Sequence, residues 1–137
     1  MKYWFVRSPY KHRKWADVLM FGVFNLYGIR NYASKKNISR MGKGDPAIWY
    51  SSRAGKMVFG IMQVKDKAFP DKTSDNGWLA IDFIPKKSLV VPVPLTNIRD
   101  NDVLSHSNII KQKRMSVVEI AKDEYDEIIK IGDNIKT

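Results

Sequence analysis

The sequence of 137 residues contains no cysteine and only two histidines. Without cysteine, disulfide bonds, thiolate catalysis and cysteine-ligated zinc are all excluded. His12 and His106 are far apart in the sequence and lack the spacing of a metal-binding pair. We therefore expect neither a metal ion nor another cofactor.

Long apolar runs are also missing. The N-terminal segment MKYWFVRSPY turns polar at Arg7, too early for the apolar region of a signal peptide. No later run approaches the roughly 20 apolar residues that cross a bilayer. We expect a soluble, cytoplasmic protein without a membrane partner, folded as a single domain over residues 1–137. No pattern in the sequence indicates an oligomeric state.

Positive charge, in contrast, is abundant. The chain has 24 Lys and Arg against 14 Asp and Glu, a formal net charge of +10. Such an excess is typical of proteins that bind a polyanion such as nucleic acid, although it also serves solubility alone. The basic residues gather in residues 7–14, 30–43 and 111–114, and the acidic ones in residues 119–127. This distribution favours one basic and one acidic face.

Short predicted elements alternate along the chain without repeats or a linker. Apolar, aromatic and β-branched runs predict strands at 2–7, 77–85, 88–95 and 115–120, and a hairpin at 47–64. Helical spacing predicts helices within residues 11–22, 31–41, 96–106 and 123–132. The prolines of 88–95 favour an edge strand. Together these elements predict an α+β fold around a mixed or antiparallel sheet that curls into a barrel.

Polar residues inside the predicted elements suggest local structure. Asn31 is a good N-cap for the helix that follows, in which Tyr32, Ile38 and Met41 are expected to face inward. Asp82 interrupts an apolar strand, so if its side chain points inward it needs a partner. An arginine such as Arg114 or the exocyclic amine of a bound base would serve.

Several short motifs occur in a fixed order along nearly the whole chain. They are KYWFVRS at 2–8, GIRNY at 28–32, GD at 44–45, WYSS at 49–52, GI at 60–61, FPD at 69–71, PVPL at 92–95 and RMSV at 114–117. This series resembles the EVE domain family. The resemblance implies a PUA-like fold, a small β-barrel flanked by short helices and related to YTH-type and SRA-type base readers. It also implies non-catalytic capture of a nucleobase, often a modified one, in DNA or RNA.

Three positions depart from the family pattern. Pro9 and its neighbours replace a Lys-Ser-Glu-Pro stretch, Ala33 replaces a glutamine, and Ser51 replaces a histidine. Each change removes or alters a polar group that could contact a base edge. The departures therefore bear on which base is bound more than on whether a pocket exists.

Capture of a single base requires an aromatic face for stacking, polar groups for the base edge and cations for the flanking phosphates. For the nucleobase pocket we expect Ser8, Trp15, Asn31, Tyr32, Trp49, Ser51, Ser52 and Asp82. For the phosphates we expect Arg7, Arg30, Lys35, Arg40, Lys56, Arg114 and Ser116. Core packing also accounts for the aromatic residues, and capping or turn formation for the Asn and Ser residues.

Two other functions fit the same composition. One is an RNA-binding accessory domain that acts on tRNA or rRNA, as PUA domains do. The other is a PUA-like hydrolase or nuclease, but the chain has no glycine-flanked nucleophilic serine, and MGKGD at 41–45 lacks the spacing of a P-loop. The Gly-Lys-Glu-Arg signature of the ASCH group is absent as well. The sequence therefore favours a binding protein over an enzyme.

Overall fold

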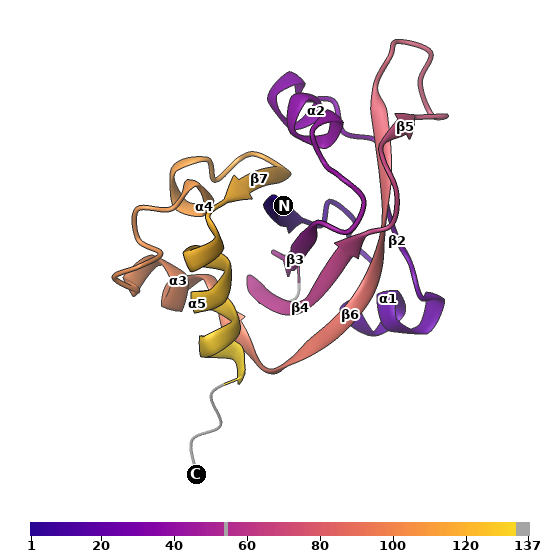
Figure 1. Ribbon diagram of the computed structural model, residues 1–137. Coiled ribbons are helices and arrows are strands. Elements are labelled where there is room, and N and C mark those ends of the chain that lie inside the picture. The colour runs from indigo at the N-terminus through magenta and orange to yellow at the C-terminus, as the bar shows by residue number, and fades with distance from the viewer. Residues whose placement is uncertain (54, 134–137) are drawn as a thin grey trace.

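A computed structural model describes residues 1–53 and 55–133. Figure 1 shows the strands and helices of the chain. The strands are β1 (Tyr3–Arg7), β2 (Phe24–Leu26), β3 (Pro46–Ser51), β4 (Met57–Val64), β5 (Phe69–Pro70), β6 (Leu79–Pro94) and β7 (Val117–Ile120). The helices are α1 (Trp15–Phe21), α2 (Tyr32–Ser39), α3 (Leu95–Asp100), α4 (Asn108–Lys111) and α5 (Lys122–Asp133). Among the described residues, no helix is long and apolar enough to cross a membrane.

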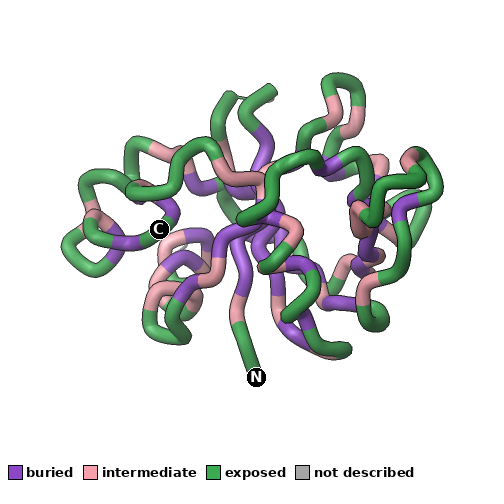
Figure 2. The backbone as a smooth tube through the Cα atoms, turned by 90° about the horizontal axis from the view of Figure 1, so that it is seen from above, coloured by how far each residue is buried: buried purple, intermediate pink, exposed green. Residues whose placement is uncertain are grey.

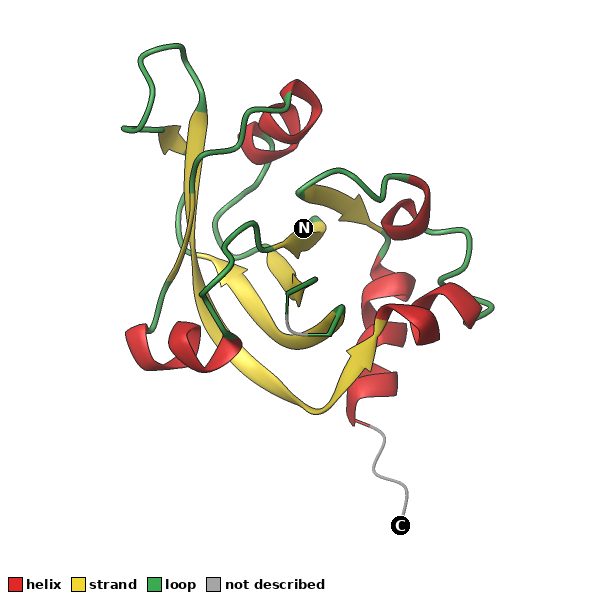
Figure 3. Ribbon diagram, turned by 180° about the vertical axis from the view of Figure 1, so that it is seen from behind, coloured by secondary structure: helices red, strands yellow, loops and turns green. Residues whose placement is uncertain are grey.

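The strands form one mixed sheet in the order β2-β6-β4-β3-β1-β7, with β5 paired to β6. Only the β1–β3 pair is parallel among these described neighbours. The 16-residue strand β6 bends along its length and wraps the sheet into an open barrel (Figures 1 and 3). The predicted α+β fold with a curled sheet is confirmed.

Apolar side chains cover both faces of the sheet because successive residues of a strand point to opposite sides. Trp4 and Trp49 belong to the cluster that also holds residues of α1 and α2. Phe5 and Ile48, their neighbours in sequence, belong to the cluster that holds residues of α3, α4 and α5. The buried segments accordingly converge at the centre of the molecule, whereas the outer loops are exposed (Figure 2).

Strand β6 departs from the sequence prediction, which had two separate strands at 77–85 and 88–95. The two are continuous, and β4 pairs with β6 from Met57 opposite Pro94 to Val64 opposite Phe83. Among the described residues, the opposite edge of β6 is paired only near its start, with β2, whereas β5 continues the edge that pairs with β4. Proline is tolerated along such an edge because no partner strand needs its missing N–H.

Helix α2 begins as predicted, because Asn31 Oδ1 accepts a hydrogen bond from Ser34 N at 2.9 Å. Ile38 and Met41 are buried, as expected. The inward orientation predicted for Tyr32 is wrong, since 77% of this residue is exposed. Its ring packs instead against Trp78, which comes from the segment between β5 and β6.

Candidate functional site

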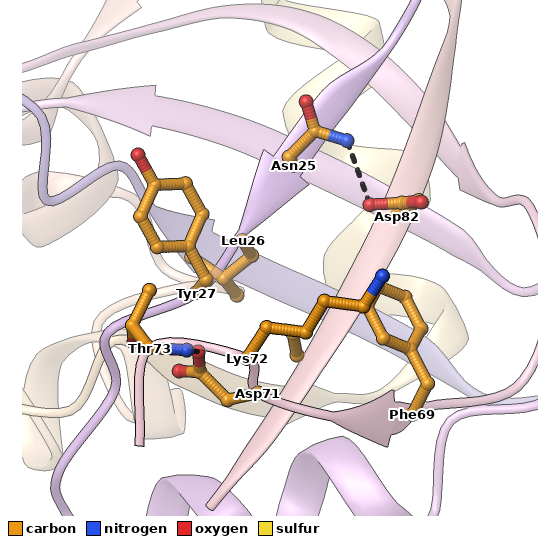
Figure 4. Close-up of a pocket in the computed structure, with 9 residues that line it drawn as sticks. Asn25, Leu26, Tyr27, Phe69, Asp71, Lys72, Thr73 and Asp82 are labelled. Carbon is orange, nitrogen blue, oxygen red and sulfur yellow. Dashed lines mark hydrogen bonds between the residues drawn. The ribbon is translucent and has the colours of Figure 1, made fainter.

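A pocket of about 400 Å³ opens between β2, β5 and β6 (Figure 4). We call it the β2–β6 pocket; it is lined by Asn25, Leu26, Tyr27, Phe69, Asp71, Lys72, Thr73, Ala80 and Asp82. Its volume lies within the range of about 300–1,000 Å³ that is usual for small-ligand pockets. Tyr27 and Phe69 are both partly exposed, so the pocket offers aromatic surface to a ligand.

The polar side of the pocket is an amide–carboxylate pair. Asn25 Nδ2 donates a hydrogen bond to Asp82 Oδ1 at 2.8 Å. The pair exists because β2 and β6 are antiparallel with Asn25 directly opposite Asp82. The partner of Asp82 within the chain is therefore Asn25, and not an arginine such as Arg114, one of the two partners considered from the sequence. Asp82 is half-buried, and a carboxylate has more acceptor sites than this one bond occupies.

Asp71 organises the other side of the pocket. It is 1% exposed, and its carboxylate accepts hydrogen bonds from Gly28 N at 2.8 Å, Thr73 N at 2.8 Å and Thr73 Oγ1 at 2.6 Å. Arg30 Nη1 adds an ion pair at 3.1 Å. Burial alone would raise the pKa of Asp71, but these donors favour the charged form and hold the pKa well below its ordinary value. Asp71 is thus a fixed anion that ties the end of β2 to the segment after β5.

The charged carboxylate of Asp71 should make the free energy of unfolding depend on pH. At pH 7 we expect Asp71→Asn to lower the free energy of unfolding by about 2 kcal/mol, because hydrogen bonds to charged groups contribute about 1.5–3 kcal/mol. The depressed pKa stabilises the fold above pH 4, the ordinary range of an aspartate, and this contribution is lost as the pH falls through the folded-state value. Denaturant unfolding at pH 7 and pH 3 should show the difference between variant and parent shrinking at pH 3.

Asp75→Asn is the matched control, because Asp75 is an exposed carboxyl in the same segment. It should change stability little at either pH. A difference for Asp71→Asn that stayed the same at both pH values would contradict the assigned role.

Tyr10 forms hydrogen bonds to the backbone of β2 and of the residue after it. Its hydroxyl donates to the carbonyl of Asn25 at 2.8 Å and accepts from Tyr27 N at 2.9 Å. Its ring also lies 5.3 Å from the ring of Tyr27. Burial raises the pKa of Tyr10 to about 12, so the hydroxyl remains protonated and keeps this donor role. Tyr10 thus fixes the backbone of β2 beside the pocket through two hydrogen bonds.

A second feature adjoins the pocket, and we call it the aromatic–basic platform; it consists of Arg30, Tyr32, Lys35 and Trp78. The rings of Tyr32 and Trp78 are 4.9 Å apart at 34°. The Arg30 guanidinium and the Lys35 ammonium each lie 5.7 Å from the centre of the Trp78 ring. Cations at this distance from an indole are attracted to its face.

Arg30 joins the platform to the pocket. The same guanidinium that faces Trp78 pairs with Asp71 and donates to Thr73 Oγ1 at 3.0 Å. Platform and pocket are therefore neighbouring parts of one surface. This surface combines exposed aromatic rings, cations and a hydrogen-bonding carboxylate, which are the groups that hold an unstacked base and its phosphates.

The other residues expected in the base pocket lie elsewhere. Trp49 is fully buried among aromatic rings, with its ring centre 5.5 Å from that of Trp15. Trp15 donates to Ser88 Oγ at 2.9 Å and packs on Gly60, where an added Cβ would lie 2.0 Å from the indole. Ser8 is buried as well. Core packing accounts for this burial, and base contact by these residues stays a prediction.

The two other serines predicted for the base pocket, Ser51 and Ser52, also lie outside the β2–β6 pocket. Ser51 is buried, and its Oγ accepts from Arg53 N at 3.2 Å. Ser52 is exposed and lines a cavity beside α3 and α4. Among the described side chains, the buried atoms Ser8 Oγ and Trp49 Nε1 have no hydrogen-bond partner.

The residues expected to contact phosphates are also divided among regions. Arg30 and Lys35 are brought together at the platform. Arg40 pairs with Glu119 at 2.6 Å beside α2, and Arg7 lines the cavity beside α3 and α4. Lys56 lies in the β3–β4 turn at a φ of 58°. Arg114 is exposed and Ser116 half-buried just before β7.

Sequence reasoning missed much of the pocket wall. Asn25 and Tyr27 lie in or beside a three-residue strand that is too short to show a periodic pattern. A proline followed by an aspartate is typical of a turn, so Pro70 and Asp71 gave no sign of a buried anion, although the motif FPD at 69–71 marked the position. Among residues 1–53 and 55–133, no three His, Asp or Glu side chains gather closely enough to hold a metal ion.

The chain matches a known protein family over nearly its whole length. The EVE domain family model matches residues 2–131. The NMR structure of Rpa0253 from Rhodopseudomonas palustris is similar to the chain with 28% identity and a TM-score of 0.90, over 100% of this chain and 97% of that one. A comparison with curated protein sequences found no match.

Two solved complexes share the fold at lower identity. Human THYN1, in complex with 5-methylcytosine containing DNA, has 17% identity and a TM-score of 0.89, over 99% of this chain and 100% of that one. The YTH domain of the Zygosaccharomyces rouxii MRB1 protein, in complex with N6-methyladenosine RNA, has 11% identity and a TM-score of 0.62, over 99% and 87%. These likenesses establish the PUA-like fold.

Proposed function

This chain belongs to the EVE domain family, and we propose that it binds nucleic acid and captures one nucleobase, bearing a modification, in the β2–β6 pocket. The observation that carries the proposal is that Arg30 of the aromatic–basic platform bonds to Asp71 and Thr73 of the pocket lining, so that platform and pocket adjoin. A base in the pocket would lie beside cations suited to its flanking phosphates. Relatives of the same fold bound to 5-methylcytosine DNA and to N6-methyladenosine RNA support this class of ligand.

Within the pocket, we assign the base edge to Asn25 and Asp82. The carboxylate of Asp82 accepts hydrogen bonds, so it favours an exocyclic amine such as N4 of cytosine or N6 of adenine. Tyr27 and Phe69 offer aromatic surface, and Lys72 brings a cation to the rim. A pocket of about 400 Å³ accommodates a base together with a small modification.

We propose binding without catalysis. Asp71, the most buried carboxylate of the pocket, is held charged by its donors, with a pKa well below the ordinary value. A general base works best with a pKa near the working pH, so this carboxylate is poorly suited to proton abstraction. Its hydrogen bonds fit a structural role instead.

Tyr32→Ala tests the platform. Because base–aromatic stacking contributes about 1–3 kcal/mol per base, we expect a loss of affinity for single-stranded oligonucleotides of roughly 5- to 150-fold. The free energy of unfolding should change by less than about 0.5 kcal/mol, since the side chain is mostly exposed. Fluorescence anisotropy titrations and a denaturant melt measure the two quantities.

Tyr32→Phe is the matched control, because it keeps the ring and removes only the hydroxyl. It should bind nearly as well as the parent chain. Equal losses of affinity for both variants, or no loss for Tyr32→Ala, would contradict a stacking role of the Tyr32 ring.

Lys35→Ala tests the phosphate contact separately. We expect affinity to fall evenly for all sequences, and the slope of log K against log salt to decrease by about one. The control is Lys86→Ala, an exposed lysine on β6 outside the platform. If both variants, or neither, changed the slope of log K against log salt, Lys35 would not be a specific phosphate contact.

A further inference from the structure

A second cavity, of about 430 Å³, lies on the other side of the sheet from α1 and α2. It opens between the ends of β1 and β3 and the helices α3 and α4. Arg7, Arg99 and Lys113 are the charged residues of its lining, and none of the eight described lining residues is acidic. We call it the basic cavity. None of its lining residues belongs to the β2–β6 pocket, so the two sites are independent.

Arg7 is the fixed part of the basic cavity. Its guanidinium is half-buried and donates to the carbonyls of Ile109 at 2.6 Å and Met115 at 2.7 Å. A third hydrogen bond reaches the carbonyl of Gln112 at 3.2 Å. Carbonyl groups orient the guanidinium but do not neutralise its charge. The cation is therefore held at the cavity wall without a carboxylate among the lining residues.

Arg99 and Lys113 supply two further cations, each on an exposed side chain. Tyr50 and Ser52 add hydroxyl donors. Burial raises the pKa of Tyr50, although Arg7 and Arg99 oppose the shift, so its hydroxyl stays protonated and able to donate. Several donors and an uncompensated positive charge thus line one cavity.

The rest of the lining is apolar and includes Leu95, Ile109 and Ile110. A ligand that joins an anionic group to an organic group could contact the cations with the first and the apolar residues with the second. A phosphomonoester carries about −1.5 to −2 charges at pH 7 and three acceptor oxygens, whereas an internal phosphodiester carries a single charge. We propose that the basic cavity binds a phosphomonoester attached to a nucleoside, either a free nucleotide or the 5′-phosphorylated end of a nucleic-acid strand.

NMR titration of the full chain tests this site, with the Tyr50 ring resonances as a local probe. The ligands are AMP, adenosine, and one DNA oligonucleotide prepared with a 5′-phosphate or a 5′-hydroxyl. AMP and the phosphorylated oligonucleotide should shift the Tyr50 resonances in a saturable way, whereas adenosine should not. Tighter binding of the phosphorylated oligonucleotide than of AMP would assign the site to strand ends, and the reverse order would assign it to free nucleotides.

The double variant Arg99→Gln/Lys113→Gln should weaken AMP binding by about tenfold or more, because charge-assisted hydrogen bonds to phosphate are lost. The control Lys86→Gln/Lys130→Gln removes the same charge from exposed lysines outside the cavity lining and should change affinity less than about twofold. Equal shifts with AMP and adenosine, or equal losses in both double variants, would overturn the proposal.

Discussion

Trp49→Ala is expected to lower the free energy of unfolding by about 3–5 kcal/mol, the usual loss when a large aromatic side chain is removed from a core. Trp49 is fully buried on β3, and its ring contacts those of Trp15, Phe24 and Phe59. Alanine would leave a cavity that these rigid rings cannot collapse to fill. Since a small domain has about 5–15 kcal/mol in total, the variant should be barely folded at 37 °C.

Denaturant unfolding of Trp49→Ala and Trp78→Ala compares the loss of a fully buried tryptophan with the loss of a half-buried one. Trp78 is only half-buried, so its removal should cost less than half as much stability. If instead the two variants were equally stable and Trp49→Ala lost only nucleic-acid binding, Trp49 would be a ligand contact rather than a core residue.

Asp82→Ala should have the largest effect on binding. The loss of a charged acceptor for the base edge, worth about 1.5–3 kcal/mol, predicts a decrease in affinity of roughly 10- to 150-fold for the preferred base. Bases without an exocyclic amine should be affected much less, so that discrimination is lost along with affinity. Because Asp82 is half-buried and hydrogen-bonded to Asn25, circular dichroism should confirm that the variant is folded.

The direction of the change in affinity distinguishes a base contact by Asp82 from a general electrostatic effect. Removal of any acidic side chain makes the chain more positive, which by itself strengthens binding to a polyanion. Asp75→Ala, an exposed carboxylate outside the lining of the β2–β6 pocket, should therefore bind as well as the parent or slightly better. Stronger binding by Asp82→Ala as well, uniform over all bases, would show that Asp82 acts only through its charge.

The strands and helix ends could be predicted because their causes are local. Apolar, aromatic and β-branched runs mark β1, β3 and β4, and the cap at Asn31 depends on a hydrogen bond three residues away. The orientation of Tyr32 could not be predicted in this way, since it depends on Trp78, which is distant in the sequence.

The pocket depends even more on long-range pairing. The contact between Asn25 and Asp82 exists only because β2, three residues long, pairs with β6 in one register. Beside the local donors of Thr73, Asp71 gains two donors from Gly28 and Arg30, which precede it by about forty residues. A charged residue after a proline resembles a turn in sequence, and only the fold makes it a buried anion. The family resemblance correctly indicated the fold, but it did not identify these contacts.

The proposed capture of a modified base is tested most directly by the ratio of affinities for matched modified and unmodified oligonucleotides. Fluorescence anisotropy at two salt concentrations should compare DNA with and without 5-methylcytosine, and RNA with and without N6-methyladenosine. We expect overall affinity to fall as salt is raised, because phosphate contacts release counterions, while preference for one modified oligonucleotide persists. Equal binding of every oligonucleotide, lost at the higher salt concentration, would contradict base capture and leave only a basic surface.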